Sequence, residues 1–239
     1  MTEAVVLLPG FMADGRVFVD QVADLSRAHA VQVAPLIGDT LEAMADSVLA
    51  HAPPKFALAG HDLGGAVAIE ILQRAPERVT RLALICAAAQ GEAPSAAAAR
   101  EPRLVCAKAG RLRDVLEEDL PQTSLADSDY RDAIRGHWME MAVQMGVDTY
   151  LQQSRVIQRR PDFQQVLRRA RLPCMMIGGA ANKIVPPRRQ EFMAELMPNA
   201  TYTCIQGAGH LPMIEAPRAL TRALQTWLEM EELAPLRWV

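Results

Sequence analysis

This chain is poor in cysteine, in lysine and in long apolar runs. No cysteine stands in a Cys-x-x-Cys pair or at a histidine spacing typical of a metal site, so we predict no metal centre and no disulfide scaffold. No apolar run approaches the roughly 20 residues of a membrane-spanning helix. The formal net charge of −3 is not basic enough for nucleic acid. We therefore expect neither a membrane nor a nucleic-acid partner.

The composition that remains fits a single compact domain, or a core domain with a small inserted lid. Half of the 239 residues are apolar and 22% are charged, and a chain of this length can bury a large core without covalent staples. The first ten residues, MTEAVVLLPG, enter an apolar run with no basic segment before it. This is not typical of a secretory signal, so we expect a cytoplasmic protein.

Short apolar runs alternate with helical apolar spacing along most of the sequence. Strands followed by helices predict an α/β fold with a mostly parallel sheet and helices on both faces. In such sheets, sites form at the carboxyl ends of the strands. The predicted strands cover residues 4–8, 31–36, 56–59, 82–86, 174–177 and 201–205.

Residues 91–162 differ, because they contain no strand-like run and carry amphipathic helical spacing. We predict that they form a helical lid inserted into a core of residues 1–90 and 163–239. Several arginines lie near the end of this segment and just after it. We interpret them as a solvated face rather than an anion site; they are Arg155, Arg159, Arg160, Arg168, Arg169 and Arg171.

The most specific feature is the turn after the third predicted strand, with the form Gly-x-nucleophile-x-Gly-Gly before a helix. Such a turn leaves its central residue, here Asp62, strained and exposed at the sheet edge. Side chains at Gly60 and Gly64 would clash there. The helix that follows directs unpaired amides towards this point, so the Leu63 amide is a candidate donor to an oxyanion.

Three further loops follow predicted strands. Pro9-Gly10 precedes Phe11, whose amide is the candidate second oxyanion donor. The loop 178–186 presents Asn182, and the Gly-Ala-Gly-His segment presents His210. The chain order is therefore nucleophile, polar orienting residue, histidine.

These four segments match the α/β-hydrolase fold superfamily in order and spacing, and the resemblance covers nearly the whole chain. The sequence is most similar to the small lidded esterase-like members, which implies an enzyme that acts on a small molecule without a cofactor or metal. Two positions depart from that pattern, where esterase-like members usually carry Ser and Asp. Here they are Asp62 and Asn182. Asp nucleophiles occur in the epoxide hydrolases and in the haloalkane and haloacetate dehalogenases of this superfamily.

A carboxylate nucleophile attacks an sp³ carbon and forms an alkyl ester, which a histidine-activated water then hydrolyses. We therefore predict hydrolysis of a small, mostly apolar electrophile through a covalent intermediate on Asp62, with His210 as base. Other marks of those families are absent. Leu63 stands where haloalkane dehalogenases often carry Trp, and Pro9-Gly10-Phe11 stands where epoxide hydrolases usually carry His-Gly-x-Pro.

The resemblance does not identify the residues that line the substrate pocket. Tyr130 and Tyr150 are the candidate lid tyrosines, and Trp138 and Met141 are candidate substrate contacts, although all four also suit the core of the lid. Because Asn182 cannot balance an imidazolium charge, Glu92 is a candidate carboxylate in support of His210.

Three alternatives remain open from the sequence. The first is an esterase scaffold that is weakly active or inactive because its nucleophile and acid are replaced. The second is a non-catalytic protein that binds a ligand in the same pocket. The third is a cofactor-free lyase or cyclase in which Asp62 acts as acid or base. The oligomeric state is not predicted.

Overall fold

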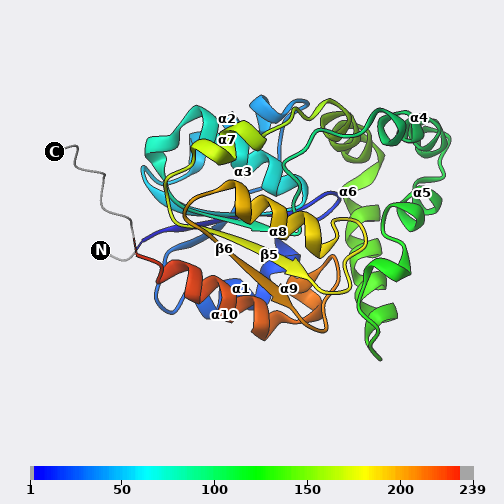
Figure 1. Cartoon of the computed structure of the whole chain (residues 1–239). Coiled ribbons are helices and arrows are strands. Elements are labelled where there is room, and N and C mark those ends of the chain that lie inside the picture. The colour runs from blue at the N-terminus through cyan, green and yellow to red at the C-terminus, as the bar shows by residue number, and fades with distance from the viewer. Residues whose placement is uncertain (1–2, 232–239) are drawn as a thin grey trace.

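A six-stranded parallel sheet forms the centre of the computed structural model, which describes residues 3–231 (Figure 1). The strand order is β2-β1-β3-β4-β5-β6, and each neighbouring pair is parallel, which confirms the predicted sheet. The strands are β1 (Val5–Leu8), β2 (Val31–Val33), β3 (Phe56–His61), β4 (Val79–Ile85), β5 (Cys174–Gly179) and β6 (Ala200–Ile205).

Helices cover both faces of the sheet, as predicted (Figure 1). Alternate residues of β1 enter different cores: Val5 and Leu7 face one, and Val6 and Leu8 face the other. This is the period-two pattern of a strand buried on both sides. One face carries α1 (Val19–Leu25), α9 (Pro212–Glu215) and α10 (Pro217–Leu228), and the other carries α2 (Leu41–His51), α3 (Leu63–Arg74), α7 (Gln164–Arg169) and α8 (Pro187–Leu196).

The strand order places a topological switch point between β1 and β3. From β1 the chain moves outward to β2 and then returns to the other side of β1 as β3. Because loops diverge at such a point, a crevice opens at the carboxyl ends of the two strands. Phe11 and Asp62 follow those two ends.

The chain between β4 and β5 contains α4 (Pro94–Lys108), α5 (Leu112–Asp119) and α6 (Arg131–Arg159), here named the helical insertion. These helices lie together beyond one end of the sheet, towards which the arrow of β5 points (Figure 1). Gly146 breaks α6 with a φ of 85°. The core and lid boundaries assigned from the sequence stay a prediction. Short 3₁₀ turns occur at Gly15–Phe18, Pro76–Arg78 and Gln122–Ser124.

Two predicted elements are shorter than expected. The strand 31–36 ends at Val33, because Pro35 cannot donate to a neighbouring strand. The helical pattern 16–29 becomes a 3₁₀ turn followed by α1, which ends at Leu25. Within residues 3–231, no helix combines the length and the apolar character needed to cross a membrane.

Candidate active site

Asp62 occupies a strained turn between β3 and α3. Its φ of 46° and ψ of −110° are unusual for a residue with a side chain. The Asp62 amide donates to the Ile85 carbonyl at 3.0 Å, and the Asp62 carbonyl accepts from the Gly65 and Ala66 amides at 3.0 and 3.2 Å. Strain of this kind persists only where the surrounding structure fixes the backbone, as these three hydrogen bonds do.

Two glycines make the turn possible, as the sequence predicted. A Cβ at Gly60 would lie 2.3 Å from the Gly64 carbonyl oxygen, and a Cβ at Gly64 would lie 2.4 Å from the Pro9 carbonyl oxygen. Both contacts are with backbone, which cannot move aside as a flexible side chain can. The absence of these two side chains lets α3 start directly at the end of the sheet.

We expect Gly60→Ala to lower the free energy of unfolding by about 1–3 kcal/mol or more, because α3 must shift to admit the methyl group. Gly136→Ala is the matched control. Its Cβ would meet nothing within 4 Å inside α6, so this change should stabilise the chain by about 0.4–1 kcal/mol. Urea denaturation of both variants measures the difference. Equal effects at the two positions would show that the turn tolerates a side chain.

The two predicted oxyanion donors are the main-chain amides of Phe11 and Leu63, which come before and after Asp62 in the sequence. The Phe11 amide donates to Asp62 Oδ2 at 3.2 Å. Leu63 is the first residue of α3, where an amide has no acceptor inside its own helix. The Phe11 amide therefore already contacts the side chain on which negative charge resides.

His210 is buried, and its main chain is anchored on two sides. Its amide donates to the Ser124 carbonyl at 2.8 Å, and its carbonyl accepts from His61 Nε2 at 2.8 Å. The rings of His61 and His210 have centroids 5.0 Å apart. A Cβ at Gly209 would lie 2.1 Å from the Ser124 carbonyl oxygen, so the histidine loop packs directly against the helical insertion region.

The charge state of the site follows from burial and from these neighbours. Burial opposes ionisation of Asp62, but His210, His61 and the Phe11 amide outweigh it, so the pKa of Asp62 is lowered. Burial lowers the pKa of His210, with partial opposition from Asp62, and lowers the pKa of His61 to about 4. At neutral pH the site therefore holds a carboxylate beside two neutral imidazoles.

Asn182 does not hydrogen-bond to His210 in the described part of the chain. Its Oδ1 accepts from the Ile184 and Val185 amides at 3.0 and 3.1 Å. Within residues 3–231, Asn182 Nδ2 and His210 Nδ1 are buried without a partner. The orienting role predicted for Asn182 is therefore not formed, because its only acceptor atom closes the turn after β5.

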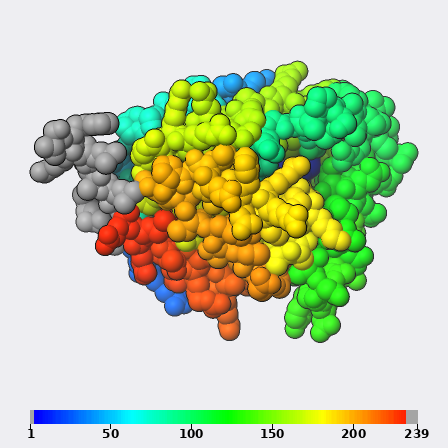
Figure 2. All heavy atoms as spheres, viewed as in Figure 1, coloured from blue at the N-terminus to red at the C-terminus, as the bar shows by residue number. Residues whose placement is uncertain are grey.

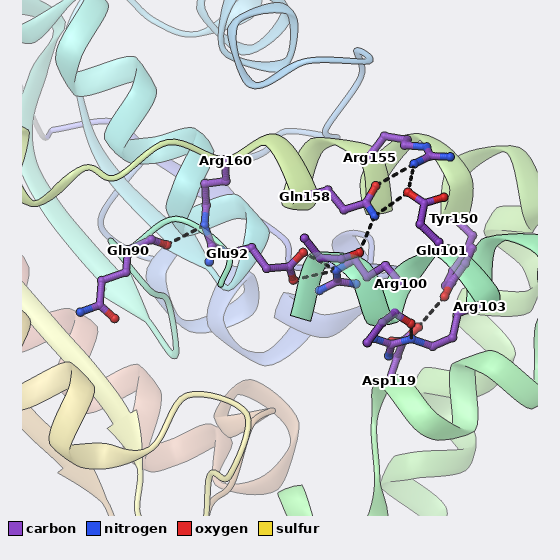
Figure 3. A network of polar contacts seen from close by, with 12 residues as sticks. Gln90, Glu92, Arg100, Glu101, Arg103, Asp119, Tyr150, Arg155, Gln158 and Arg160 are labelled. Carbon is purple, nitrogen blue, oxygen red and sulfur yellow. Dashed lines mark hydrogen bonds and ion pairs between the residues drawn. The ribbon is translucent and has the colours of Figure 1, made fainter. Parts of the chain in front are cut away.

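Glu92, the candidate carboxylate in support of His210, is also engaged elsewhere. Its Oε1 accepts from Arg100 Nε at 2.7 Å, and the two side chains form an ion pair on the cavity wall (Figure 3). Both Glu92 oxygens accept from Arg100 Nε, so this carboxylate already has a cationic partner. The structure thus supplies His210 with neither of the orienting partners considered from the sequence.

A cavity of about 280 Å³ lies over Asp62 and His210. Figure 2 shows a hollow between the helical insertion and the segment before α8, with N-terminal residues visible at its floor. The sequence predicts a mostly apolar substrate, yet charged side chains of both signs line this cavity. Besides Asp62, these are Glu92, Arg100, Asp119, Arg160 and Arg189.

Of the four candidate substrate contacts, only Trp138 lines this cavity. Tyr130 is 73% exposed and borders a different hollow. Met141 is fully buried, and its sulfur accepts from the Asp14 amide. Tyr150 packs its ring edge-on against Phe11, 5.6 Å between centroids, and its hydroxyl donates to Asp119 at 2.9 Å. Tyr150 therefore supports two residues of the wall without forming part of it.

Arg160 is the site residue that the sequence interpretation missed. The arginine-rich run predicts a solvated face at this position, yet Arg160 lines the cavity with Asp62. Arg155 and Arg159, on the preceding turns of α6, border a separate surface hollow. The available signal was Pro161, which ends α6 and changes the direction of the chain at Arg160.

Comparisons with known proteins agree with this architecture. The family model described as alpha/beta hydrolase fold matches residues 37–217. The pimeloyl-[acyl-carrier protein] methyl ester esterase of Klebsiella pneumoniae is 27% identical over 194 residues, which are 77% of this chain and 74% of that esterase. A thermophilic esterase from Thermogutta terrifontis has a TM-score of 0.85 at 24% identity, covering 95% of this chain and 89% of that one.

The enol-lactonase from Burkholderia xenovorans LB400 also has a TM-score of 0.85, at 21% identity, covering 96% of this chain and 92% of that one. The likenesses to these two solved structures extend over nearly the whole chain. The fold expected from the four strand-end segments is therefore confirmed.

Proposed function

The chain belongs to the α/β-hydrolase fold family, and we propose that this hydrolase hydrolyses a small electrophile through a covalent ester on Asp62. One observation carries the proposal: the Asp62 carboxyl group stands on the strained turn, accepts a hydrogen bond from the Phe11 amide and lines the cavity. Although burial opposes ionisation, the neighbours of Asp62 lower its pKa, which favours the carboxylate. A carboxylate needs no base to become a nucleophile. The absence of a hydrogen bond between Asn182 and His210 is therefore no obstacle to the first step.

In that first step an oxygen of Asp62 attacks an sp³ carbon. The new C–O bond completes an alkyl ester. With an alkyl halide, the carbon–halogen bond breaks and the halide leaves with the electron pair; with an epoxide, the ring C–O bond breaks to an alkoxide, which takes up a proton from solvent. The cavity volume of about 280 Å³ limits the substrate to a short one. The substrate classes are thus small alkyl halides and epoxides.

In the second step His210 takes a proton from water, and the resulting hydroxide adds to the ester carbonyl carbon of Asp62. Negative charge develops on the ester oxygen, where the Phe11 amide already donates. Collapse expels the alcohol oxygen, which takes the proton from His210, and the acid on Asp62 loses its proton to solvent. The lowered pKa of His210 keeps it neutral at neutral pH, as a base requires.

A second candidate, hydrolysis of a carboxylic ester, is favoured by the relatives named above, one of which is a methyl ester esterase. In this chain Asp62 would not form the usual acyl intermediate. His210 would have to direct water onto the bound ester without a nucleophilic side chain, so we expect this activity to be weak.

Solvent ¹⁸O separates the covalent mechanism from direct attack by water. In a single turnover with excess protein, a short epoxide or alkyl halide and H₂¹⁸O, the product oxygen should come from Asp62 and carry no label. The peptide containing Asp62 should instead gain one ¹⁸O, read by mass spectrometry. Label that enters the product in the first turnover would overturn the covalent step.

Two carboxylate variants complete this test. Asp62→Asn should abolish turnover and labelling. Asp20 is an exposed carboxylate on α1, so Asp20→Asn should behave as the unaltered chain does. Binding of electrophiles without turnover or label would instead support a ligand-binding role.

A further inference from the structure

Arg160 is held in place by the backbone of the loop that follows β4. It is the C-terminal cap of α6, and its Nε donates to the Gln90 carbonyl at 3.1 Å (Figure 3). This bond uses one edge of the guanidinium and leaves the two terminal nitrogens for another acceptor. Arg160 and Asp62 both line the cavity, so a small molecule in it contacts both.

The acidic side chains of the same wall already have cationic partners. Glu92 pairs with Arg100 at 2.7 Å, and Asp119 pairs with Arg103 at 2.5 Å (Figure 3). In the part of the chain that the structure describes, no carboxylate oxygen forms an ion pair with Arg160. Its charge is therefore not neutralised by direct contact within the protein.

Partial burial makes an unpaired charge at Arg160 costly. Burial lowers the pKa of Arg160, while the more distant charges of Asp62 and Glu92 raise it. A guanidinium nevertheless stays protonated at neutral pH. Arg160 is half-buried, and a half-buried cation without an ion-pair partner favours an anion beside it. The planar fork of its terminal N–H groups matches a carboxylate.

We infer that Arg160 binds a carboxylate on the substrate and that the electrophile is a short halocarboxylate or an epoxide that bears a carboxylate. This inference rests on the proposed function, because Arg160 then holds one end of the molecule while Asp62 attacks the other. The cation also offsets the repulsion between an anionic substrate and the Asp62 carboxylate. For a 2-halocarboxylate, water replaces the halogen, and the products are a 2-hydroxycarboxylate, a halide ion and a proton.

The test compares 2-chloropropionate with 2-chloropropionamide, which has the same skeleton without the charge. The unaltered chain should prefer the carboxylate. Arg160→Gln should lower kcat/KM for the carboxylate by about 100-fold, mainly through KM, and change the amide far less. Arg160→Lys, which keeps the charge but loses the fork, should lie between. Glycidate and glycidamide form the equivalent epoxide pair.

Arg159→Gln is the matched control, because Arg159 is exposed, adjacent in sequence and outside the cavity. It should leave the preference for the carboxylate unchanged. If the unaltered chain prefers the amide, or if Arg160→Gln affects both substrates equally, the inference is overturned. The preference of the unaltered chain and the Arg160→Lys result carry the test even where Arg160→Gln does not fold.

Binding of unreactive propionate, followed by NMR titration, separates this inference from the proposed function. Propionate binding that is lost in Arg160→Gln, together with no Asp62 ester from any electrophile, would refute the covalent mechanism and keep the anion site. Esters formed only from neutral electrophiles, with no binding of propionate, would keep the mechanism and refute the anion site.

Discussion

A stable alkyl ester on Asp62 should accumulate when His210→Gln protein is incubated with an electrophile that the unaltered chain turns over. Formation of the ester needs only the ionised carboxylate. Burial raises the pKa of Asp62 and His210 lowers it, but in the His210→Gln protein His61, the Phe11 amide and Arg160 still lower it. Hydrolysis of the ester needs His210 as base. Losing a general base should reduce turnover by about 10²–10⁴-fold, whereas the first step should continue until every Asp62 is esterified.

The His210→Gln change should leave the histidine loop in place, because the hydrogen bonds that hold this loop are made by the main chain of residue 210. The Ser124 carbonyl accepts from the His210 amide, and His61 donates to the His210 carbonyl. Both bonds survive a change of side chain. The measurement is the intact mass, which should rise by the alkyl group of the substrate, followed by location of the added mass on the peptide that contains Asp62.

Two further variants make this result decisive. Asp62→Asn combined with His210→Gln should show no added mass. His51→Gln, at the exposed end of α2, should turn over as the unaltered chain does. Full turnover by His210→Gln would remove this histidine from the mechanism, and loss of turnover without an ester would place His210 before the covalent step.

The nucleophile turn was predictable because its determinants are adjacent in sequence. A strand, two glycines and a helix force one backbone path, and Asp62 is the residue at its tip. The same holds for the parallel sheet, since each strand is a short apolar run closed by a turn. Local rules of this kind transfer from sequence to structure without knowledge of distant contacts.

Contacts between distant loops were not predictable in the same way. The sequence brings Asn182 and His210 to the same edge of the sheet, but it does not show that the Asn182 oxygen is occupied by two amides of its own loop. An arginine-rich run also does not show which of its arginines lines the cavity. That choice depends on where α6 ends and on the Gln90 carbonyl, which is 70 residues away in the chain.

The residues of the helical insertion that face the cavity were not predictable from the sequence either. Trp138 and Met141 lie one turn apart on α6, yet Trp138 lines the cavity while Met141 contacts the Asp14 amide behind it. Amphipathic spacing identifies the buried side of a helix, but a helix between the core and a cavity buries residues towards both. The packing partner, rather than the spacing, decides which residue lines the cavity.

Asp62→Ser combined with Asn182→Asp should turn the chain into an esterase for short activated esters such as p-nitrophenyl acetate. The candidate oxyanion donors are the main-chain amides of Phe11 and Leu63, so they do not depend on the side chain at position 62. A serine there needs His210 to remove its proton, and His210 Nδ1 has no acceptor within the described residues. The single Asp62→Ser change therefore leaves a weak nucleophile.

We expect the second change to supply the missing acceptor. Asn182 Oδ1 holds the Ile184 and Val185 amides, and Nδ2 is buried without a partner in the described part of the chain. An aspartate can keep the first role with one oxygen and offer the other to His210. Because triad members act as a unit, kcat/KM of the double variant should exceed that of either single variant by at least about 100-fold.

The control pairs Asp62→Ser with Asn199→Asp, which adds the same charge at a residue that bonds to the Arg171 carbonyl, away from the cavity. That variant should be no better than Asp62→Ser alone. Urea denaturation confirms that each variant is folded before its rate is compared. A folded Asp62→Ser, Asn182→Asp chain without esterase activity would show that its cavity does not position an acyl group. Attack by Asp62 on an sp³ carbon would then be the chemistry that this geometry favours.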